Sequence, residues 1–563
     1  MSAIPKKHGK LYYTIRWTLR VLLILLLAFL LLFHRPIYSL GRAVLGTGLL
    51  EKDAEKLTYT EQTLTQEQML ADFDYLYQNC CTDSLVREQA ERYLQLDYDA
   101  LYQTYRTRIE NCKDAYEFGV VMCSFMAKLP GLHGSVFPPT DDMSFSQGFP
   151  LGWECAFDGV REVNYAYWEQ FRDRMFSYTQ KSAVVRNYGG DYVFLDHSFG
   201  NEQIEGLAGG RLLSLNGEPI RTALRELDTV HPWAYDAELD CVRVVNLIFN
   251  DSIGKPYDAE IEMPDGSILH KTLYNSAEYN YAVQYRNSVY PQEESAGSSD
   301  SAEGVRKCYT IETDSSRKLV FVRNNSCDGT QSDQFYEDLT AALAEADAEN
   351  IILDIRNNGG GSADFATKGL CRALFDKETG FVCYSRFPKT DITKLFLDNT
   401  FYLGLCGIKK EDLGEQVRYS EDFTAPGDAA KHYHIYVLIS GVTFSSGDIF
   451  ANIAAAEDNV TLLGENTGGE GLTGNPLSYY LPESKFAFTF TPGISEQNPD
   501  DNYVGVRPDI YCPNTWENNT LADKMTADPE IGENAGKLEY RAAWDKPVAE
   551  ALKLIDSGAD QPS

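Results

Sequence analysis

Two adjacent serines, Ser445 and Ser446, stand where a hydroxyl could act as a nucleophile, within the stretch 441–450, GVTFSSGDIF. Strand-forming residues precede them in 434–440, HIYVLIS, and apolar residues follow at helical spacing. The pattern predicts a strand-to-helix turn, which holds a hydroxyl above the sheet edge beside the unpaired first N–H groups of the helix. Such a turn suits a nucleophile with half an oxyanion hole. Because serine is also a usual capping residue, an ordinary helix N-cap is the alternative.

Three consecutive glycines, Gly359, Gly360 and Gly361, follow the strand-like run 350–355, NIILDI. Glycines at the end of a strand let backbone N–H groups approach a ligand, so an oxyanion or phosphate cradle is one interpretation. A flexible turn is the other. No GK[ST] follows, which excludes a Walker nucleotide loop.

A histidine, His133, lies on the loop 129–135, LPGLHGS, where Pro and Gly end a helical stretch. A nucleophilic serine needs a base to accept its proton, and a loop histidine can serve. Taken alone, such a histidine is more often a polar surface residue. A second pair, His432 and His434, has no third ligand nearby, so no metal site is expected.

These residues fall in different parts of a long chain. Its 563 residues are long enough for roughly three or four domains. Residues 51–140 read as a helical subdomain carrying His133, 141–204 as a β-rich connection and 290–305, rich in Ser, Gly and acidic residues, as a linker. Strands and helices alternate in 306–515, which predicts a mainly parallel sheet covered by helices. Residues 516–563 read as a polar, peripheral C-terminal tail.

Residues 205–280 contain GRLLSLNGEPI and a later Asp-Gly turn, which indicate short strands. The first segment resembles the strand and Asn-Gly turn of a PDZ domain, although a generic β-hairpin would look similar. A PDZ-like module would bind a polypeptide as an added strand, preferably through a free C-terminus.

The N-terminus predicts a membrane anchor. Residues 1–16 are basic and 17–33, WTLRVLLILLLAFLLLF, form an apolar run just long enough to span a bilayer. Positive charge before the run predicts a cytoplasmic N-terminus and an exported body in a single-pass cell-membrane protein. A cleaved signal peptide is the rival, but no clear small-x-small cleavage site follows before His34.

Net charge and cysteine content exclude two further classes of protein. The formal net charge is −33, although residues 1–50 contain seven Lys and Arg and no acidic residue. So acidic a body argues against nucleic-acid binding, which needs a basic surface. The twelve cysteines include no CxxC motif and are too sparse for a disulfide scaffold.

Four motifs in order resemble the tail-specific, or C-terminal processing, serine peptidases. Residues 351–361 resemble "LILDLRNNPGG" with Gly359 in place of proline, 443–450 resemble "TASASEIF", 463–469 resemble "VGExTxG" and 505–510 match "GVxPDI". The resemblance covers about residues 306–512. It implies an α/β, ClpP/crotonase-like fold in which Ser445 is the nucleophile and the oxyanion donors are Gly360 and Ser446, with Gly359 and Gly361 lining the substrate site.

One departure from the family pattern concerns the base. The processing peptidases place a lysine in "TxGKG", but residues 467–471 read TGGEG, and Glu470 cannot act as a neutral amine. The tricorn-like branch instead uses a histidine within a motif like "LxDGHT", which the loop of His133 resembles without the aspartate. The resemblance thus implies His133 as general base, and an acidic residue just upstream of "GVxPDI" as its partner: Asp501 or Asp500, unless Asn502 occupies the position.

Together these observations predict a membrane-anchored extracytoplasmic serine peptidase that hydrolyses polypeptides through a Ser-His mechanism. No metal or organic cofactor is implied. A catalytically inactive scaffold of the same fold, which binds peptides or apolar ligands, is the alternative, because fold alone does not guarantee chemistry.

Overall fold

The computed structural model describes residues 17–26, 29, 64–129, 131, 133–136, 171–198, 202–229, 231–289, 307–390, 393, 409–474, 476–484 and 486–558. The chain divides into two compact units, 1–62 with 139–167 and 63–138 with 168–563. In the first, residues 17–26 are helical. Within the described residues no helix is both long and apolar enough to cross a membrane. The predicted anchor 17–33 is described only in part, and the predicted linker 290–305 lies outside the described residues.

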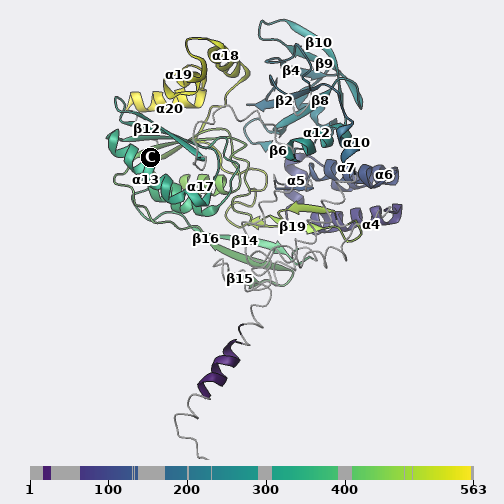
Figure 1. The fold of residues 1–563 in the computed structure, drawn as a ribbon, viewed down its shortest axis with the longest axis horizontal. Helices are drawn as coiled ribbons and strands as arrows, with labels where there is room; N and C mark the ends of the chain where they lie inside the picture. Colours follow the sequence, from purple (N-terminus) through teal and green to yellow (C-terminus); the bar gives the residue numbers. More distant parts are fainter. Residues whose placement is uncertain are drawn as a thin grey trace, which may run out of the picture. The chain divides into compact units, whose positions relative to one another are not determined.

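The centre of the second unit is a six-stranded sheet in the order β11-β12-β13-β17-β18-β22. All neighbours from β12 to β22 pair in parallel, and only the edge strand β11 is antiparallel. These pairings confirm the mainly parallel arrangement predicted for 306–515, and Figure 1 shows strand β12 of the sheet beside α13. Its strands are β11 Tyr309–Asp314, β12 Leu319–Asn324, β13 Asn350–Asp354, β17 His434–Ile439, β18 Val460–Gly464 and β22 Ile510–Tyr511.

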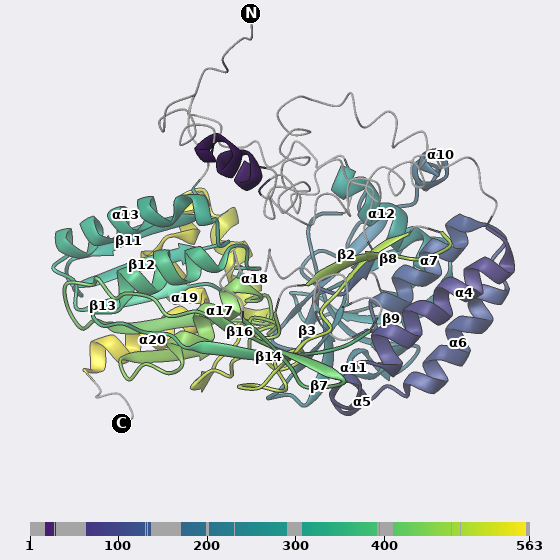
Figure 2. The same ribbon diagram turned by 90° about the horizontal axis from the view of Figure 1, so that it is seen from below.

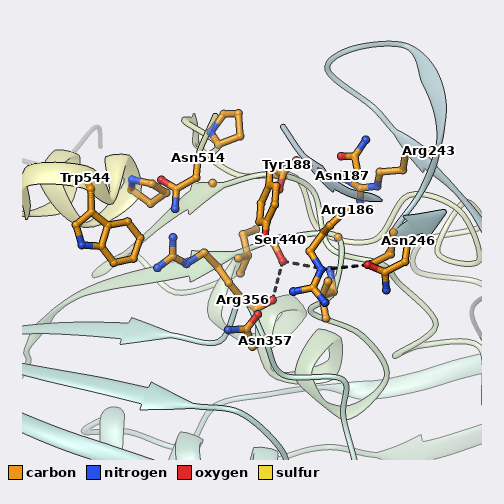
Figure 3. A pocket seen from close by; sticks show the side chains of 18 of the residues that line it. Arg186, Asn187, Tyr188, Arg243, Asn246, Arg356, Asn357, Ser440, Asn514 and Trp544 are labelled. Atoms are coloured by element: carbon orange, nitrogen blue, oxygen red, sulfur yellow. Dashed lines mark hydrogen bonds and ion pairs between the residues drawn. The ribbon is translucent and has the colours of Figure 1, made fainter. Parts of the chain in front are cut away.

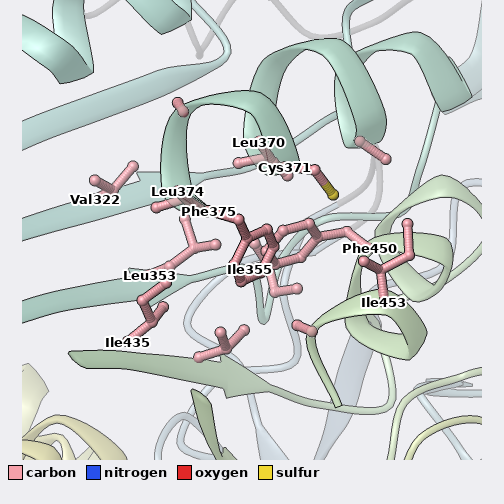
Figure 4. Packing of buried hydrophobic residues seen from close by; sticks show 14 of the residues in the cluster. Val322, Leu353, Ile355, Leu370, Cys371, Leu374, Phe375, Ile435, Phe450 and Ile453 are labelled. Atoms are coloured by element: carbon pink, nitrogen blue, oxygen red, sulfur yellow. The ribbon is translucent and has the colours of Figure 1, made fainter. Parts of the chain in front are cut away.

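One face of this sheet packs on a layer of helices. They are α13 Ser332–Glu345, the π-helix η5 Phe365–Cys371, the short α14 Arg372–Leu374 that continues it, and α17 Ser446–Ala454. Figure 4 shows side chains of the strands meeting Phe375 of the segment after α14 and Phe450 of α17. Strands buried on both faces read as continuous apolar runs, which is why β13 and β17 were recognisable in the sequence. The core thereby fixes where α17 begins.

The other face is covered by the C-terminal helices, contrary to the peripheral tail expected for 516–563. Val548, Ala551 and Leu552 of α20 recur at helical spacing and pack on the apolar side chains of β12, β13 and β17. Figures 1 and 2 show α19 and α20 on the side of the sheet opposite α13. The C-terminal elements are α18 Trp516–Ala527, η6 Gly532–Gly536, α19 Leu538–Trp544 and α20 Lys546–Ser557.

In the described residues 64–129 of the segment expected to be helical, four α-helices and one π-helical turn follow one another. Aromatic rings of Phe73, Tyr105 and Phe125 pack at their centre, with Phe73 and Phe125 edge to face. The elements are α4 Gln66–Tyr77, η1 Gln78–Thr82, α5 Arg87–Leu94, α6 Tyr98–Glu110 and α7 Ala115–Met126. The loop that follows α7 carries His133.

A seven-stranded antiparallel sheet, β3-β2-β8-β10-β9-β4-β5, includes the segment compared with a PDZ domain, and an added β3–β4 pairing closes it on itself. It joins strands from both sides of the expected boundary at 204/205. They are β2 Ser182–Tyr188, β3 Asp191–Phe194, β4 Arg211–Leu215, β5 Glu218–Pro219, β8 Asn246–Asn250, β9 Lys255–Glu262 and β10 Ile268–Asn275.

Smaller elements complete the unit. Around the seven-stranded sheet lie α10 Arg172–Phe176, α11 Ile220–Ala223, η2 Leu224–Glu226, α12 Ala277–Val289 and the hairpin β6 Trp233–Asp236 with β7 Cys241–Val244. Near the parallel sheet lie η4 Gly329–Gln331 and the strands β14 Val382–Pro388, β15 Lys409–Asp412, β16 Gln416–Asp422 and β21 Ile494–Ser495. A third sheet pairs β1, Ser135–Val136, with β20, Ala487–Phe490, and β20 with β19, Leu477–Tyr480.

Candidate active site

Ser445 occupies the turn between β17 and α17, as predicted. It is the N-cap residue of α17, yet its side chain caps nothing, and its backbone has φ 56° and ψ −123°. A positive φ is strained for a residue with a Cβ and is found where a side chain must be held in a set direction. The half-buried hydroxyl is hydrogen-bonded to none of the described residues. The capping alternative therefore does not account for this serine.

The neighbouring Ser446 has a different environment. Its side chain is 4% exposed, and its Oγ donates a 2.8 Å hydrogen bond to the carbonyl oxygen of Gly361. As the first residue of α17 it has a backbone N–H without an intrahelical acceptor. The structure therefore separates the two serines into one with an uncommitted hydroxyl and one with a structural hydroxyl.

His133 is brought to this turn by the third sheet. Ser135 of β1 pairs with Thr489 of β20, and Thr489 Oγ1 donates to the His133 carbonyl oxygen at 2.6 Å. The imidazole packs against the ring of Phe444, the residue before Ser445, with a centroid separation of 4.3 Å. The sheet and the ring contact together place His133 beside the nucleophile turn.

The carboxylate beside His133 belongs to Glu470. Glu470 Oε2 lies 2.9 Å from His133 Nδ1 and accepts the backbone N–H of His133 at 2.8 Å. The Glu470 side chain is fully buried, and the imidazole is 14% exposed. A buried carboxylate on Nδ1 holds the proton there and leaves Nε2 as the acceptor. Among the described residues nothing hydrogen-bonds to His133 Nε2.

Gly131 explains how the Glu470 carboxylate fits against the histidine loop. Its φ is +88°, and a Cβ at this position would lie 2.0 Å from Glu470 Oε1. Glu470 itself has φ 57°, and its N–H donates to the carbonyl oxygen of Asp501 at 2.9 Å. A glycine in the loop and a left-handed glutamate are thus both needed to bring the two segments into contact.

Asp501, the residue expected to orient His133, does not lie against it. In the described part of the chain its carboxylate accepts the N–H of Leu472 at 2.9 Å and contacts no atom of His133. The second candidate, Asp500, accepts a 2.5 Å hydrogen bond from the hydroxyl of Tyr93. The carboxylate in contact with His133 is instead that of Glu470. Glu470 stands where the family lysine was expected, and the sequence motif indicates no carboxylate partner for a histidine at this position.

Asp501 instead forms a buried carboxyl pair with Asp448 of α17. Both side chains are 0% exposed. Burial and the neighbouring Asp448 charge hold the pKa of Asp501 well above its usual range, and burial also raises the pKa of Asp448. The pair receives N–H groups from both residues after Glu470, since Asp448 accepts Gly471 N at 3.3 Å and Asp501 accepts Leu472 N. It therefore supports the segment that carries Glu470.

Hydrogen bonds between backbones join this segment to the nucleophile turn. The Ser445 N–H donates to the Gly469 carbonyl oxygen at 3.0 Å, and the Gly468 N–H donates to that of Thr443 at 2.7 Å. The two turns thus form one rigid unit.

The glycine run lies beside Ser445, but the predicted oxyanion donor is already engaged. A Cβ on Gly360 would lie 2.6 Å from Ser445 Cβ, which confirms the close approach. The Gly360 N–H, however, donates to Asn358 Oδ1 at 2.9 Å. Gly361 pairs with Cys327, whose carbonyl oxygen leaves no room for a Cβ, whereas Gly359 is exposed and open.

No group of described residues is suited to hold a metal ion. His432 Nδ1 lies 3.1 Å from Asp376 Oδ1 and His432 Nε2 3.7 Å from Asp458. These are contacts of an exposed ion pair. The site thus offers a free hydroxyl, an imidazole with an available nitrogen and a buried carboxylate, which is the set that acyl transfer requires.

Comparison with known proteins agrees with this chemistry. Residues 318–512 match Peptidase family S41. A carboxyl-terminal-processing protease from Synechocystis sp. is 26% identical over 217 residues, which cover 36% of this chain and 43% of that protein, so less than half of the relative is matched.

One solved structure is similar at the level of the fold. A mutant of CPAF superposes with a TM-score of 0.50 and 15% identity, covering 88% of this chain and 99% of the other. The tricorn protease is similar with a TM-score of 0.27 and 13% identity, covering 79% of this chain and 34% of the other. The match of residues 318–512 to Peptidase family S41 agrees with the family that the four sequence motifs resemble.

Proposed function

We propose that this protein is a serine peptidase that hydrolyses peptide bonds of polypeptides with Ser445 as nucleophile, His133 as general base and Glu470 as the carboxylate that orients the base. The observation that carries the proposal is the 2.9 Å contact between the buried Glu470 carboxylate and His133 Nδ1, next to a serine whose hydroxyl caps nothing.

The reaction follows from these positions. His133 Nε2 takes the Ser445 proton as Oγ bonds to the carbonyl carbon, and the tetrahedral oxyanion faces the N–H of Ser446. The C–N bond then breaks, and the His133 proton passes to the leaving amine. Water attacks the acyl-enzyme, His133 takes its proton and returns it to Ser445 Oγ, and the carboxylic acid product leaves. The Glu470 carboxylate, in contact with Nδ1, stabilises the imidazolium at each stage.

The test compares the two serines in the full chain. We expect Ser445→Ala to lower kcat/KM for a fluorogenic polypeptide by about 10⁴-fold or more and to abolish labelling by a fluorophosphonate. Ser446→Ala is the matched control, because its hydroxyl is committed to Gly361 and should lose only several-fold. Equal labelling of the Ser445→Ala variant and the native chain would overturn the assignment.

A peptide-binding scaffold without catalysis is the second candidate, and two observations favour it. The Gly360 N–H is bonded to Asn358, and within the described residues no hydrogen bond joins Ser445 to His133. The two functions separate cleanly, because a scaffold would bind polypeptides with equal affinity in the native and Ser445→Ala chains and would take no fluorophosphonate label.

We further propose that 17–33 anchors the chain in the cell membrane, with the peptidase outside the cytoplasm. The support is the apolar run of 17–33 and the basic residues before it; the described side chains of 17–26 are all exposed, Trp17 at 67% and Ile24 at 64%. Protease added to intact cells should digest the body of the chain. Protection of the body from that protease would contradict this topology.

A PDZ-like role for residues 205–280 is also proposed, as the part that binds the substrate polypeptide by strand addition. It is supported by the short strand, Asn216-Gly217 turn and helix α11 in this segment. Deleting the segment would perturb the closed sheet, so binding of a peptide to the intact Ser445→Ala chain is the appropriate measurement. A crosslinked peptide that maps outside 205–280 would contradict the role.

A further inference from the structure

A cavity of about 480 Å³ is lined in part by the loop 440–442, and Ser445 is not among its lining residues. Its walls come from β2 and β8 of the seven-stranded sheet, from the ends of β17 and β18, and from the C-terminal segment around Trp544 (Figure 3). Most of the side chains in Figure 3 are polar. The catalytic residues proposed above do not line this space.

Four arginines line the cavity: Arg186, Arg243, Arg356 and Arg541. Arg356 is neutralised, because its guanidinium donates to Asp354 and to Asp545, with two bonds of 2.7 Å from Nη2. Arg541 lies between the same two carboxylates, but its buried Nη1 has no hydrogen-bond acceptor among the described residues. This part of the wall is therefore close to charge balance.

Arg186 is the cation without a counter-charge. No described carboxylate lies within ion-pair distance of it, and its Nε donates to the neutral Asn246 side chain at 3.1 Å. Figure 3 shows both side chains on the wall that the seven-stranded sheet contributes. An arginine without a carboxylate keeps several N–H groups available for a planar anion.

Arg243 is only 5% exposed and is poorly satisfied for so buried a charge. The carboxylates of Asp236 and Glu465 lie 3.6 Å from its Nη1, beyond hydrogen-bond distance, and its Nε has no acceptor among the described residues. Its one hydrogen bond goes from Nη2 to the Asn466 carbonyl oxygen at 3.2 Å. A buried donor left unpaired destabilises the folded chain unless another molecule supplies an acceptor.

Among the described residues, Glu465 is the one carboxylate that lines the cavity. It should repel a bound anion less than an ordinary glutamate does. Burial raises the pKa of Glu465 despite the nearby Arg243, which favours its neutral form. The wall then presents unsatisfied guanidinium donors to a space large enough for a small ligand.

We propose that this cavity binds an oxyanion, a carboxylate or a phosphate-type group, held by the guanidinium groups of Arg186 and Arg243. Guanidinium pairs with such groups bidentately, and the unsatisfied donors of both arginines find acceptors in it. The same chemistry could come from a free anion or from the C-terminal carboxylate of a peptide. The inference does not depend on the proposed catalysis, because it concerns binding only.

The experiment is calorimetric titration of the full-length Ser445→Ala chain, which cannot hydrolyse a peptide ligand. Three probes are used: inorganic phosphate, an acetylated tetrapeptide with a free C-terminus, and the same tetrapeptide as its C-terminal amide. Binding of phosphate indicates a free-anion site, and binding of the acid but not the amide indicates a peptide C-terminus. Equal binding of acid and amide without phosphate binding would overturn the proposal, as would no binding of any probe.

Variants assign the binding to the cavity. Arg186→Gln removes the unpaired cation, and Asn246→Asp supplies Arg186 with an internal carboxylate at nearly unchanged volume. Each should weaken binding of the active probe by about tenfold or more. Arg418→Gln, on β16 and paired with Glu496 outside the cavity, is the control and should bind as before. Because Asn246→Asp adds an ion pair and deletes nothing, its unchanged affinity would overturn the proposal even if Arg186→Gln failed to fold.

Discussion

The turns that follow β17 and β18 each contain one non-glycine residue with a positive φ. The side chain of the first residue makes no hydrogen bond among the described residues, whereas the side chain of the second does. Ser445 has φ 56° and a hydroxyl without a hydrogen bond among the described residues. Glu470 has φ 57°, and its carboxylate accepts the backbone N–H of His133 and lies 2.9 Å from His133 Nδ1, while its own N–H donates to Asp501. The turn after β17 thus leaves the Ser445 hydroxyl free, and the turn after β18 holds the Glu470 carboxylate against His133.

The difference shows where rigidity is needed. A nucleophile must exchange its proton and form a bond, so its hydroxyl is kept free of structural hydrogen bonds. The group proposed to orient the base must stay in place, and the fully buried Glu470 carboxylate is held there through its Oε2, which accepts the His133 N–H. The backbone bonds from Ser445 to Gly469 and from Gly468 to Thr443 keep the two functions in register.

The largest effect on catalysis is expected from removing the charge of the Glu470 carboxylate. Glu470→Gln keeps the shape of the side chain but no longer stabilises an imidazolium, and it permits the wrong tautomer of His133. We expect kcat to fall by about 10³- to 10⁴-fold with little change in KM. Steady-state kinetics on a fluorogenic polypeptide measures both parameters.

Asp500→Asn is the control, since this carboxylate precedes Asp501, whose carbonyl oxygen accepts the Glu470 N–H, but binds Tyr93 instead of His133. It should keep kcat within a few-fold of the native value. A loss in Asp500→Asn as large as in Glu470→Gln would mean that Glu470 is not the orienting group.

A smaller effect is expected from crowding the contact between the loops. In Gly131→Ala the new Cβ would overlap Glu470 Oε1 and push it from His133, at a backbone position with φ +88°. We expect the folded chain to lose about 1 to 3 kcal/mol of stability and kcat to fall roughly 10²-fold.

Gly217→Ala separates the two causes, because Gly217 has φ +82° and no atom within 4 Å of its Cβ position. It should lose stability through backbone strain alone and retain kcat. If Gly131→Ala and Gly217→Ala had the same kinetics, the Gly131–Glu470 contact would have no catalytic role. Urea unfolding and kinetics on both variants decide the matter.

The smallest effect is expected on stability, from the carboxyl pair of Asp501 and Asp448 next to the segment that carries Glu470. Asp501 has a raised pKa in the folded chain, so above the ordinary Asp pKa of 3.8 the folded state binds more protons than the unfolded state. Stability from this group is therefore full at low pH and is lost as pH rises toward the folded pKa. Asp501→Asn should flatten this decline by up to about 1.4 kcal/mol per pH unit. Urea unfolding at pH 5 and pH 7 measures the slope, and an unchanged slope would contradict a protonated pair.

The parallel sheet could be predicted because each strand is an apolar run between turn residues. Residues 350–355 and 434–440 carry enough local information to place both strands and the turn at Ser445. The C-terminal helix α20 was missed, although Val548, Ala551 and Leu552 have helical spacing, because charged residues between them make the segment polar on average.

The partner of His133 could not be predicted in the same way. Glu470 is 337 residues from His133, and its direction depends on its own positive φ and on the space that Gly131 leaves. Local patterns do not encode a contact of that kind. A usable signal was present, since a carboxylate at the position of the family lysine can serve a histidine, and glycines flank both residues.

The hydrogen bond from Gly360 to Asn358 carries a consequence for substrate choice. A substrate carbonyl oxygen that uses the Gly360 N–H must first displace the Asn358 amide, at a cost of about 1 kcal/mol. A long polypeptide can offset that cost through contacts elsewhere, whereas a small ester cannot. On the proposed mechanism, we therefore expect the chain to discriminate by substrate length before it discriminates by side chain.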